Sequence, residues 1–265
     1  MDAQTFMTRD PLTIQPDCSC GEALRMMDDE GIRHLPVVQD GVLMGIVSDR
    51  ELFSRTGWRI LGAYDAGETP LAVSGVMVKS VVSVKPEDQV LSVLLELMVS
   101  EVGCLPVLKG DKLVGIITEM DMLALYFSRA RAHASAGEPD VTVGEVSSKS
   151  IAILEPTATL EQADELCHLK GFHHVPVMED GELLGILSDR DLRRAGGAGI
   201  SSQSPVEDLM SQDVVTVNED EMVATAAELM HEYKISSVLV ERGGITGILT
   251  IKDVLEQGMS VLRGK

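Results

Sequence analysis

The chain has 265 residues, and its 42 acidic and 22 basic residues give it a formal net charge of −20. That charge disfavours a nucleic-acid partner, whose phosphates must be met by Lys and Arg, and it disfavours anionic membrane surfaces. The hydrophobic content of 45% is ample for globular cores, but no run approaches the roughly 18 apolar residues of a membrane-spanning helix.

The first part of the chain predicts a strand, a helix and a hairpin. Residues 7–17 (MTRDPLTIQPD) predict a short strand that ends near Ile14. Residues 18–30 place apolar side chains on one face, which indicates a helix, and Gly31 is expected to end it in the left-handed conformation. Residues 31–55 (GIRHLPVVQDGVLMGIVSDRELFSR) then predict strand, turn, strand and helix.

The same order of elements recurs three more times. Gly103 and Gly171 are expected to end the helices that precede the second and third hairpins. In the third copy, Gly181 supplies the positive φ of a tight turn, and Ser188 with Asp191 fits a helix N-cap. The three further hairpin-and-helix stretches are residues 103–125, 171–194 and 235–257.

Two markers fix the spacing of the four copies, which recur at steps of 70, 70 and 62 residues. One marker is a strand glycine: Gly45, Gly115, Gly185 and Gly247. The other is an acidic residue six positions later: Glu51, Asp121, Asp191 and Asp253. Four copies of one supersecondary unit outweigh any single motif.

We therefore expect an α/β fold of four β-α-β-β-α repeats. A unit of about 50 residues has a small core and an exposed sheet face, so it should pair with a neighbour. Repeats 1 and 2 are expected to form one module, and repeats 3 and 4 another. The expected repeats span residues 1–55, 74–127, 141–195 and 204–258. The connectors between them are residues 56–73, which carry Trp58, the polar stretch 128–140, and residues 196–205.

The repeated pattern resembles the CBS domain. It consists of an opening MT-x-x-x-x-T-h, a helix, h-P-V-V, a turn, and G-I-h-[ST]-x-x-[DE]. Two such units in tandem resemble a Bateman module, and the resemblance covers about residues 1–258. It implies pairing of two units through their sheets, with adenosine-type ligands in clefts between them. It also implies a regulatory, non-enzymatic role in which ligand binding is passed to an unidentified protein effector.

The resemblance assigns the ligand's ribose to the acidic marker of each repeat and its phosphate to the Ser or Thr three positions earlier. A helix N-terminus presents unpaired N–H groups to an anion, and a carboxylate beside it can accept ribose hydroxyls. The same pair can also be a helix cap that needs no ligand. The ribose candidates are Glu51, Asp121, Asp191 and Asp253, and the phosphate candidates are Ser48, Thr118, Ser188 and Thr250.

The resemblance also places basic residues at the hairpin entrance, against phosphates. These further phosphate candidates are Arg33, His34, His173 and His174, and the helix start after the third hairpin adds Arg190. The matching entrance positions in repeats 2 and 4 are neutral, so we expect the repeat-3 cleft to be the best phosphate site; solvated surface cations are the alternative. The candidates beside the base, at the end of the opening strand, are Thr13, Ile14, Ser83, Ile153 and Thr216.

The ligand expected first is AMP, ADP or ATP, with or without Mg²⁺, as a regulatory ligand and not a catalytic cofactor. S-adenosylmethionine or a dinucleotide is the alternative, and the cationic sulfonium suits the less basic clefts of repeats 2 and 4. A ligand-free scaffold for protein interaction is a further alternative. The sequence leaves open whether two modules assemble within one chain or through a homodimer.

Metal and redox sites are not indicated. His173 and His174 are adjacent on a strand and point to opposite faces, so they cannot readily chelate one ion. The four cysteines form no C-x-x-C pair and have no zinc-finger spacing. The start, MDAQTFMTRD, lacks an apolar signal core. We therefore expect a cytoplasmic protein with reduced thiols.

Overall fold

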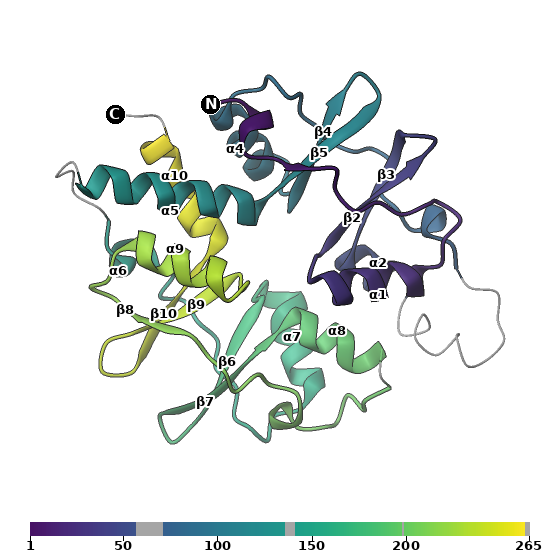
Figure 1. Cartoon of the computed structure of the whole chain (residues 1–265). Helices are drawn as coiled ribbons and strands as arrows, with labels where there is room; N and C mark the ends of the chain where they lie inside the picture. The colour runs from purple at the N-terminus through teal and green to yellow at the C-terminus, as the bar shows by residue number, and fades with distance from the viewer. Residues whose placement is uncertain (57–70, 136–140, 198, 263–265) are drawn as a thin grey trace. The chain divides into compact units, whose positions relative to one another are not determined.

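The computed structural model describes residues 1–56, 71–135, 141–197 and 199–262 (Figure 1). The chain forms two compact units: the first runs over Met1–Thr118, and the second over Glu119–Ala195 and Ile200–Lys265. The hairpins of repeats 1 and 2 lie in the first unit and those of repeats 3 and 4 in the second, whereas residues 119–127 of the expected repeat 2 belong to the second unit. Trp58 lies outside the described residues.

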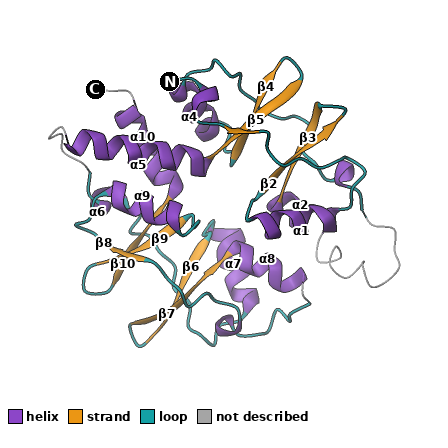
Figure 2. Ribbon diagram, viewed as in Figure 1, coloured by secondary structure: helices purple, strands orange, loops and turns teal. Residues whose placement is uncertain are grey.

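Unit 1 contains two hairpins, each with helices of its own repeat (Figure 2). Repeat 1 comprises η1 (Ala3–Thr5), β1 (Thr8–Arg9), α1 (Cys20–Glu30), β2 (His34–Gln39), β3 (Val42–Ser48) and α2 (Asp49–Thr56). Repeat 2 contributes η2 (Val73–Gly75), α4 (Val90–Val99), β4 (Cys104–Lys109) and β5 (Lys112–Thr118).

Unit 2 begins with α5 (Glu119–Ser135), the last helix of repeat 2. Repeat 3 comprises α6 (Val143–Val146), α7 (Leu160–Lys170), β6 (His174–Glu179), β7 (Glu182–Ser188) and α8 (Asp189–Gly197). Repeat 4 comprises η3 (Val206–Asp208), β8 (Thr216–Asn218), α9 (Val223–Glu232), β9 (Ser237–Glu241), β10 (Ile245–Thr250) and α10 (Ile251–Leu262). No helix in the described residues is both long and apolar enough to span a membrane.

The expected opening strand divides into two separate pairings in repeat 1. Ile14 makes a single parallel bridge to Val37 of its own hairpin. Thr8 and Arg9 instead pair antiparallel with β5 of repeat 2, where Thr8 lies opposite Ile116. The sequence did not show this second pairing, because it joins residues more than a hundred positions apart.

The residues that precede α1, α4, α7 or α9, here called the opening segment of each repeat, pair with the other repeat of the same unit throughout. In the remaining three repeats, one residue of the opening segment lies against the second hairpin strand of the paired repeat: Val78 against Ile46, Ser148 against Ile248, and Ser211 against Ile186. These contacts are antiparallel bridges, so backbone hydrogen bonds join the two repeats of each unit. They give the expected pairing through sheets a defined register.

The strand glycines are required by this pairing. A Cβ atom added to Gly185 would lie 2.7 Å from the carbonyl oxygen of Ser211, and one on Gly247 would lie 2.6 Å from that of Ser148. Both distances fall far below the 3.4 Å at which ordinary van der Waals contact begins. The other two glycines meet the same obstacle: Gly45 against Val78 and Gly115 against Thr8. The repeated glycine therefore marks where one repeat's backbone crosses the other.

Two helix ends and one hairpin turn follow the predicted chemistry, and one helix end departs from it. Gly31 (φ 64°) and Gly171 (φ 71°) end α1 and α7 in the left-handed conformation. Gly181 (φ 86°) and the preceding Asp180 (φ 49°) form the expected tight hairpin turn. The expectation for Gly103 was wrong: α4 ends at Val99, and Glu101 (φ 51°) takes the left-handed conformation instead.

The expected polar boundary at residues 128–140 was also wrong in its first part. Helix α5 continues to Ser135, and its buried face includes Met122, Tyr126 and Ala130, spaced one turn apart. This face packs against α9 and α10, and Figure 1 shows the three helices together. Alanine and arginine are strong helix formers, so the stretch extends the helix once a packing partner is present.

Candidate functional site

The end of β7 and the start of α8 form the candidate site of repeat 3. The Ser188 N–H donates to Oδ2 of Asp191 at 2.9 Å, and its hydroxyl donates to the same oxygen at 2.5 Å. The Asp191 N–H lies 3.3 Å from the Ser188 Oγ and donates to it. These reciprocal bonds form a capping box, so the predicted cap is confirmed. The cap uses Oδ2 of the carboxylate, and a carboxylate has a second oxygen that can accept.

The same junction recurs in repeats 4 and 1. The Thr250 N–H and hydroxyl donate to Oδ2 of Asp253 at 2.8 and 2.7 Å. In repeat 1, the Ser48 N–H donates to Oε2 of Glu51 at 3.2 Å, and the Ser48 hydroxyl bonds the same oxygen. The longer glutamate therefore still reaches the cap. In repeat 2, Thr118 ends β5 and Asp121 lies in the first turn of α5, and both are partly buried.

A salt-bridge cluster lies beside the repeat-3 cap. Arg193 donates to both carboxylate oxygens of Asp189, with Nη1 to Oδ2 at 2.7 Å and Nη2 to Oδ1 at 3.3 Å. His173 Nδ1 lies 3.3 Å from Oδ2 of the same carboxylate. Burial would raise the pKa of Asp189, but hydrogen bonds and positive charge from His173 and Arg193 outweigh it and hold that pKa well below its usual range.

Repeat 1 has a reduced version of this cluster. Arg33 Nε lies 3.6 Å from Oδ2 of Asp49, whose side chain is almost fully buried. Burial lowers the pKa of the neighbouring His34 to about 4; Arg33 adds to that lowering, and the charges of Asp49 and Glu51 only partly oppose it. His34 is therefore uncharged at neutral pH, which corrects its expected role as a cation. A neutral imidazole can still donate or accept one hydrogen bond.

The two adjacent histidines of repeat 3 contact different groups. His173 contacts Asp189 in its own repeat, whereas His174 Nε2 lies 3.2 Å from the hydroxyl of Ser236 in repeat 4. The hairpin entrances of the two paired repeats therefore meet directly. Arg190, the remaining basic candidate here, is partly buried. The described residues contain no group of three or more His, Cys, Asp or Glu side chains placed to hold a metal ion.

The candidates beside the base differ in accessibility. Thr13, Ser83 and Ile153 are exposed, and Thr216 is partly buried. Ile14 is only 4% exposed and lies in the core of repeat 1, so its side chain offers no surface to a base. This corrects the expectation for Ile14. Ile14 forms the bridge to β2 and points into the core, whereas the preceding Thr13 points outward.

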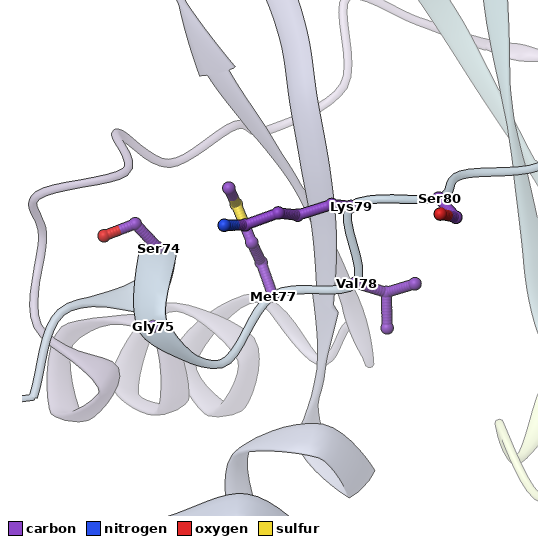
Figure 3. Close-up of a pocket in the computed structure, with 6 residues that line it drawn as sticks. All are labelled: Ser74, Gly75, Met77, Val78, Lys79 and Ser80. Atoms are coloured by element: carbon purple, nitrogen blue, oxygen red, sulfur yellow. The ribbon is translucent and has the colours of Figure 1, made fainter.

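An open depression of about 490 Å³ lies on unit 1 beside the opening segment of repeat 2. The residues lining it are Ser74, Gly75, Met77, Val78, Lys79 and Ser80. Figure 3 shows that the Met77 and Lys79 side chains extend toward each other while Val78 points away from them. No predicted site residue lines this depression, so it does not coincide with the junctions described above.

Sequence reasoning missed Asp49 and Asp189. The signal was available in the repeats themselves, because the residue after the capping Ser is Asp in repeats 1 and 3, where the entrance is basic. An acidic residue beside expected cations could have been identified as their partner.

Comparison with known proteins identifies the repeats. The family model for the CBS domain matches residues 3–56, 73–128, 143–197 and 206–259. The uncharacterised protein MJ1225 of Methanocaldococcus jannaschii is 22% identical over 92% of this chain and 94% of its own length. A homoserine O-acetyltransferase of Methanohalophilus mahii is 36% identical, but the match covers 42% of this chain and only 23% of that enzyme.

Two solved structures share the fold over nearly the whole chain. The structure of MJ1225 superimposes with a TM-score of 0.77 at 21% identity, covering 97% of this chain and 99% of that one. A conserved protein from Pyrococcus horikoshii gives 0.67 at 22% identity, covering 97% and 100%. With four matched domains arranged in two pairs, the chain belongs to the CBS-domain family as two tandem Bateman modules.

Proposed function

We propose that this chain is a regulatory, non-enzymatic sensor that binds adenosine-containing ligands between paired CBS repeats, with AMP, ADP or ATP as the best-fitting ligands. The observation that carries the proposal is the geometry at the start of α8. There the carboxylate of Asp191 is fixed against the N–H of Ser188, at the N-terminus of a helix that begins beside the hairpin entrance. A protein effector would receive the response.

The ribose is the part of the ligand that this geometry suits best. The cap orients the Asp191 carboxylate, and its remaining acceptor positions can take hydroxyl groups of a sugar diol. Hydrogen bonds to a charged group contribute about 1.5–3 kcal/mol, and partial burial reduces competition from water. Asp253 and Glu51 repeat the arrangement, so the same chemistry is available in repeats 4 and 1.

The phosphate is supported most strongly in repeats 3 and 1. The first N–H groups of α8 and its positive dipole end favour an anion, and His173 and Arg190 add basic groups at the same junction. Arg33 supplies the equivalent charge in repeat 1. Gly103 and Ser236 replace these basic residues in repeats 2 and 4, so a ligand with less negative charge suits those clefts better.

The contact between His174 and Ser236 suggests how binding would act on the protein. A ligand placed between the two hairpin entrances would touch both repeats, and it would favour the relative packing that it binds more tightly. It can shift that equilibrium only by its differential affinity for the two arrangements. The change in packing is then the signal available to an effector.

Isothermal titration of the full chain with AMP, ADP, ATP and S-adenosylmethionine tests the proposal. Asp191→Ala should weaken nucleotide binding at one class of site by at least about tenfold, since it removes a charged acceptor. Gln162→Ala is the matched control, because Gln162 closes a capping box at α7 of the same repeat without lying at the hairpin junction.

A melting-temperature screen gives an independent readout. A ligand at 100 times its dissociation constant adds about 2.7 kcal/mol of stability, which is readily measured. If none of these ligands stabilises the chain, the sensor role is wrong and a ligand-free scaffold remains. If Asp191→Ala and Gln162→Ala weaken binding equally, the carboxylate acts only as a cap.

A further inference from the structure

The carboxylate of Asp189 holds two basic side chains, His173 and Arg193, beside the repeat-3 junction. It receives two hydrogen bonds from Arg193, one turn along α8, and lies 3.3 Å from the ring of His173 at the hairpin entrance. The side chains of Asp189 and Arg193 are each only 17% exposed, so water screens their interaction weakly. An incoming phosphate therefore meets basic groups that already hold an anion.

The internal repeats show that the fold does not require a carboxylate at this position. The Asp189 N–H donates to the carbonyl oxygen of His173 at 3.0 Å, which ties the helix start to the hairpin entrance. In repeat 4 the Ile251 N–H makes the same bond to Ser236, also at 3.0 Å. An apolar residue thus preserves the backbone connection, and the charge of Asp189 serves another purpose.

In repeats 1 and 3 an acidic residue contacts the basic entrance. Both repeats combine an entrance Arg or His with Asp directly after the capping Ser, and in both the pair is in contact. Repeat 2 carries Glu119 after Thr118 beside a neutral entrance, and repeat 4 has Ser236 at the entrance and Ile251 after the capping Thr. An acidic residue at this position is therefore not confined to basic junctions, but where the entrance is basic the contact lets the carboxylate offset its charge.

We propose that Asp189 sets the ligand charge that the repeat-3 cleft accepts, so that adenosine with one phosphate group is favoured over the di- and triphosphate. The inference rests on the proposed function. Each added phosphate brings negative charge toward a carboxylate that stays ionised and that shares the same basic partners. Asp189 acts through His173 and Arg193 as well as directly, so it is a specificity-determining residue of that cleft.

Titration of the full chain with AMP, ADP and ATP tests this inference, with repeat-3 binding identified as the component that Asp191→Ala removes. Asp189→Asn should raise the affinity for ATP relative to AMP by on the order of tenfold. Asp180→Asn is the matched control: it removes the same charge from the same repeat, at a hairpin-turn position (φ 49°) that asparagine tolerates. It should leave the ATP-to-AMP ratio unchanged.

Arg193→Gln provides a second variant should Asp189→Asn fail to fold, as judged by its melting temperature. Removing the arginine leaves Asp189 less neutralised, so discrimination against ATP should increase. Equal changes for all three nucleotides, or the same ratio shift in Asp180→Asn, would overturn the inference while leaving the sensor role intact. Absence of any nucleotide binding to the wild-type chain would instead refute the proposed function, and this inference with it.

Discussion

Replacing Gly45 by alanine tests whether the crossing of the two backbones holds repeats 1 and 2 together. The new Cβ would lie 2.8 Å from the carbonyl oxygen of Val78 and 2.8 Å from the Sδ atom of Met77. Ordinary contact begins at 3.4 Å, so the opening segment of repeat 2 must move by about 0.6 Å. The two hydrogen bonds between Ile46 and Val78, at 3.0 and 2.8 Å, lie directly in the path of that movement.

The magnitude follows from these terms. Overpacking of this kind costs about 1–3 kcal/mol, and each weakened backbone hydrogen bond adds up to about 1 kcal/mol. Alanine recovers about 0.5–1 kcal/mol by restricting the unfolded chain. At their midpoints these terms sum to about 2 kcal/mol, so Gly45→Ala should lower the free energy of unfolding by about 2 kcal/mol in urea denaturation. Amide hydrogen exchange at Ile46 and Val78 should accelerate, because their mutual bonds are weakened.

Gly75→Ala is the matched control in the same unit. A Cβ there meets only a side-chain carbon of Leu71 at 3.5 Å, so stability should stay within about 0.5 kcal/mol of the wild type. Full stability and unchanged amide protection in Gly45→Ala would refute the reasoning.

Three further predictions concern a cap, a titrating group and a packed helix. Ser188→Ala removes the hydroxyl from the capping box at α8, and urea denaturation should show a loss of about 1 kcal/mol. The folded-state pKa of His34, about 4, is below its ordinary value of 6.5, so the unfolded chain binds more protons between these limits. Stability should therefore fall as pH drops from about 6.5 to 4, and His34→Gln should flatten that part of a melting-temperature profile. Tyr126→Ala removes a fully buried side chain from α5 and should lower the free energy of unfolding by about 3–5 kcal/mol. Arg131→Ala removes a solvent-exposed salt bridge with Glu228 and should lower it by at most about 1 kcal/mol in the same denaturation assay.

The features that the sequence predicted well are those with a local signature. The turn at Gly181 and the helix end at Gly31 follow from residues that tolerate positive φ, and the cap at Ser188 follows from a partner three positions away. The repetition at fixed steps also predicted that repeats pair, because each repeat alone leaves one face of its sheet exposed.

The features that the sequence did not reveal depend on partners distant along the chain. The pairing of Thr8 with Ile116 and the continuation of α5 to Ser135 both depend on contacts with another repeat. The inward orientation of Ile14 follows from its bridge to Val37. The salt bridge between Arg193 and Asp189 joins residues only four positions apart. The sequence alone did not predict it, because opposite charges at that spacing can either form a salt bridge or remain separately solvated, and burial decides between the two.

The pairing of opening segments with the other repeat links the candidate site of repeat 3 to repeat 4 by a short path within unit 2. Strand β7 carries Ile186, whose two backbone hydrogen bonds go to Ser211 of repeat 4, and two residues later Ser188, which holds Asp191. A ligand that bound Asp191 would therefore act on a strand whose neighbour belongs to the other repeat. Gly185 allows the two backbones to approach this closely, so the residue that marks the repeat in the sequence is also the one that would couple the clefts. Regulation by relative packing needs such a backbone connection between repeats. A ligand confined to one independent repeat could not alter how that repeat packs against its neighbour.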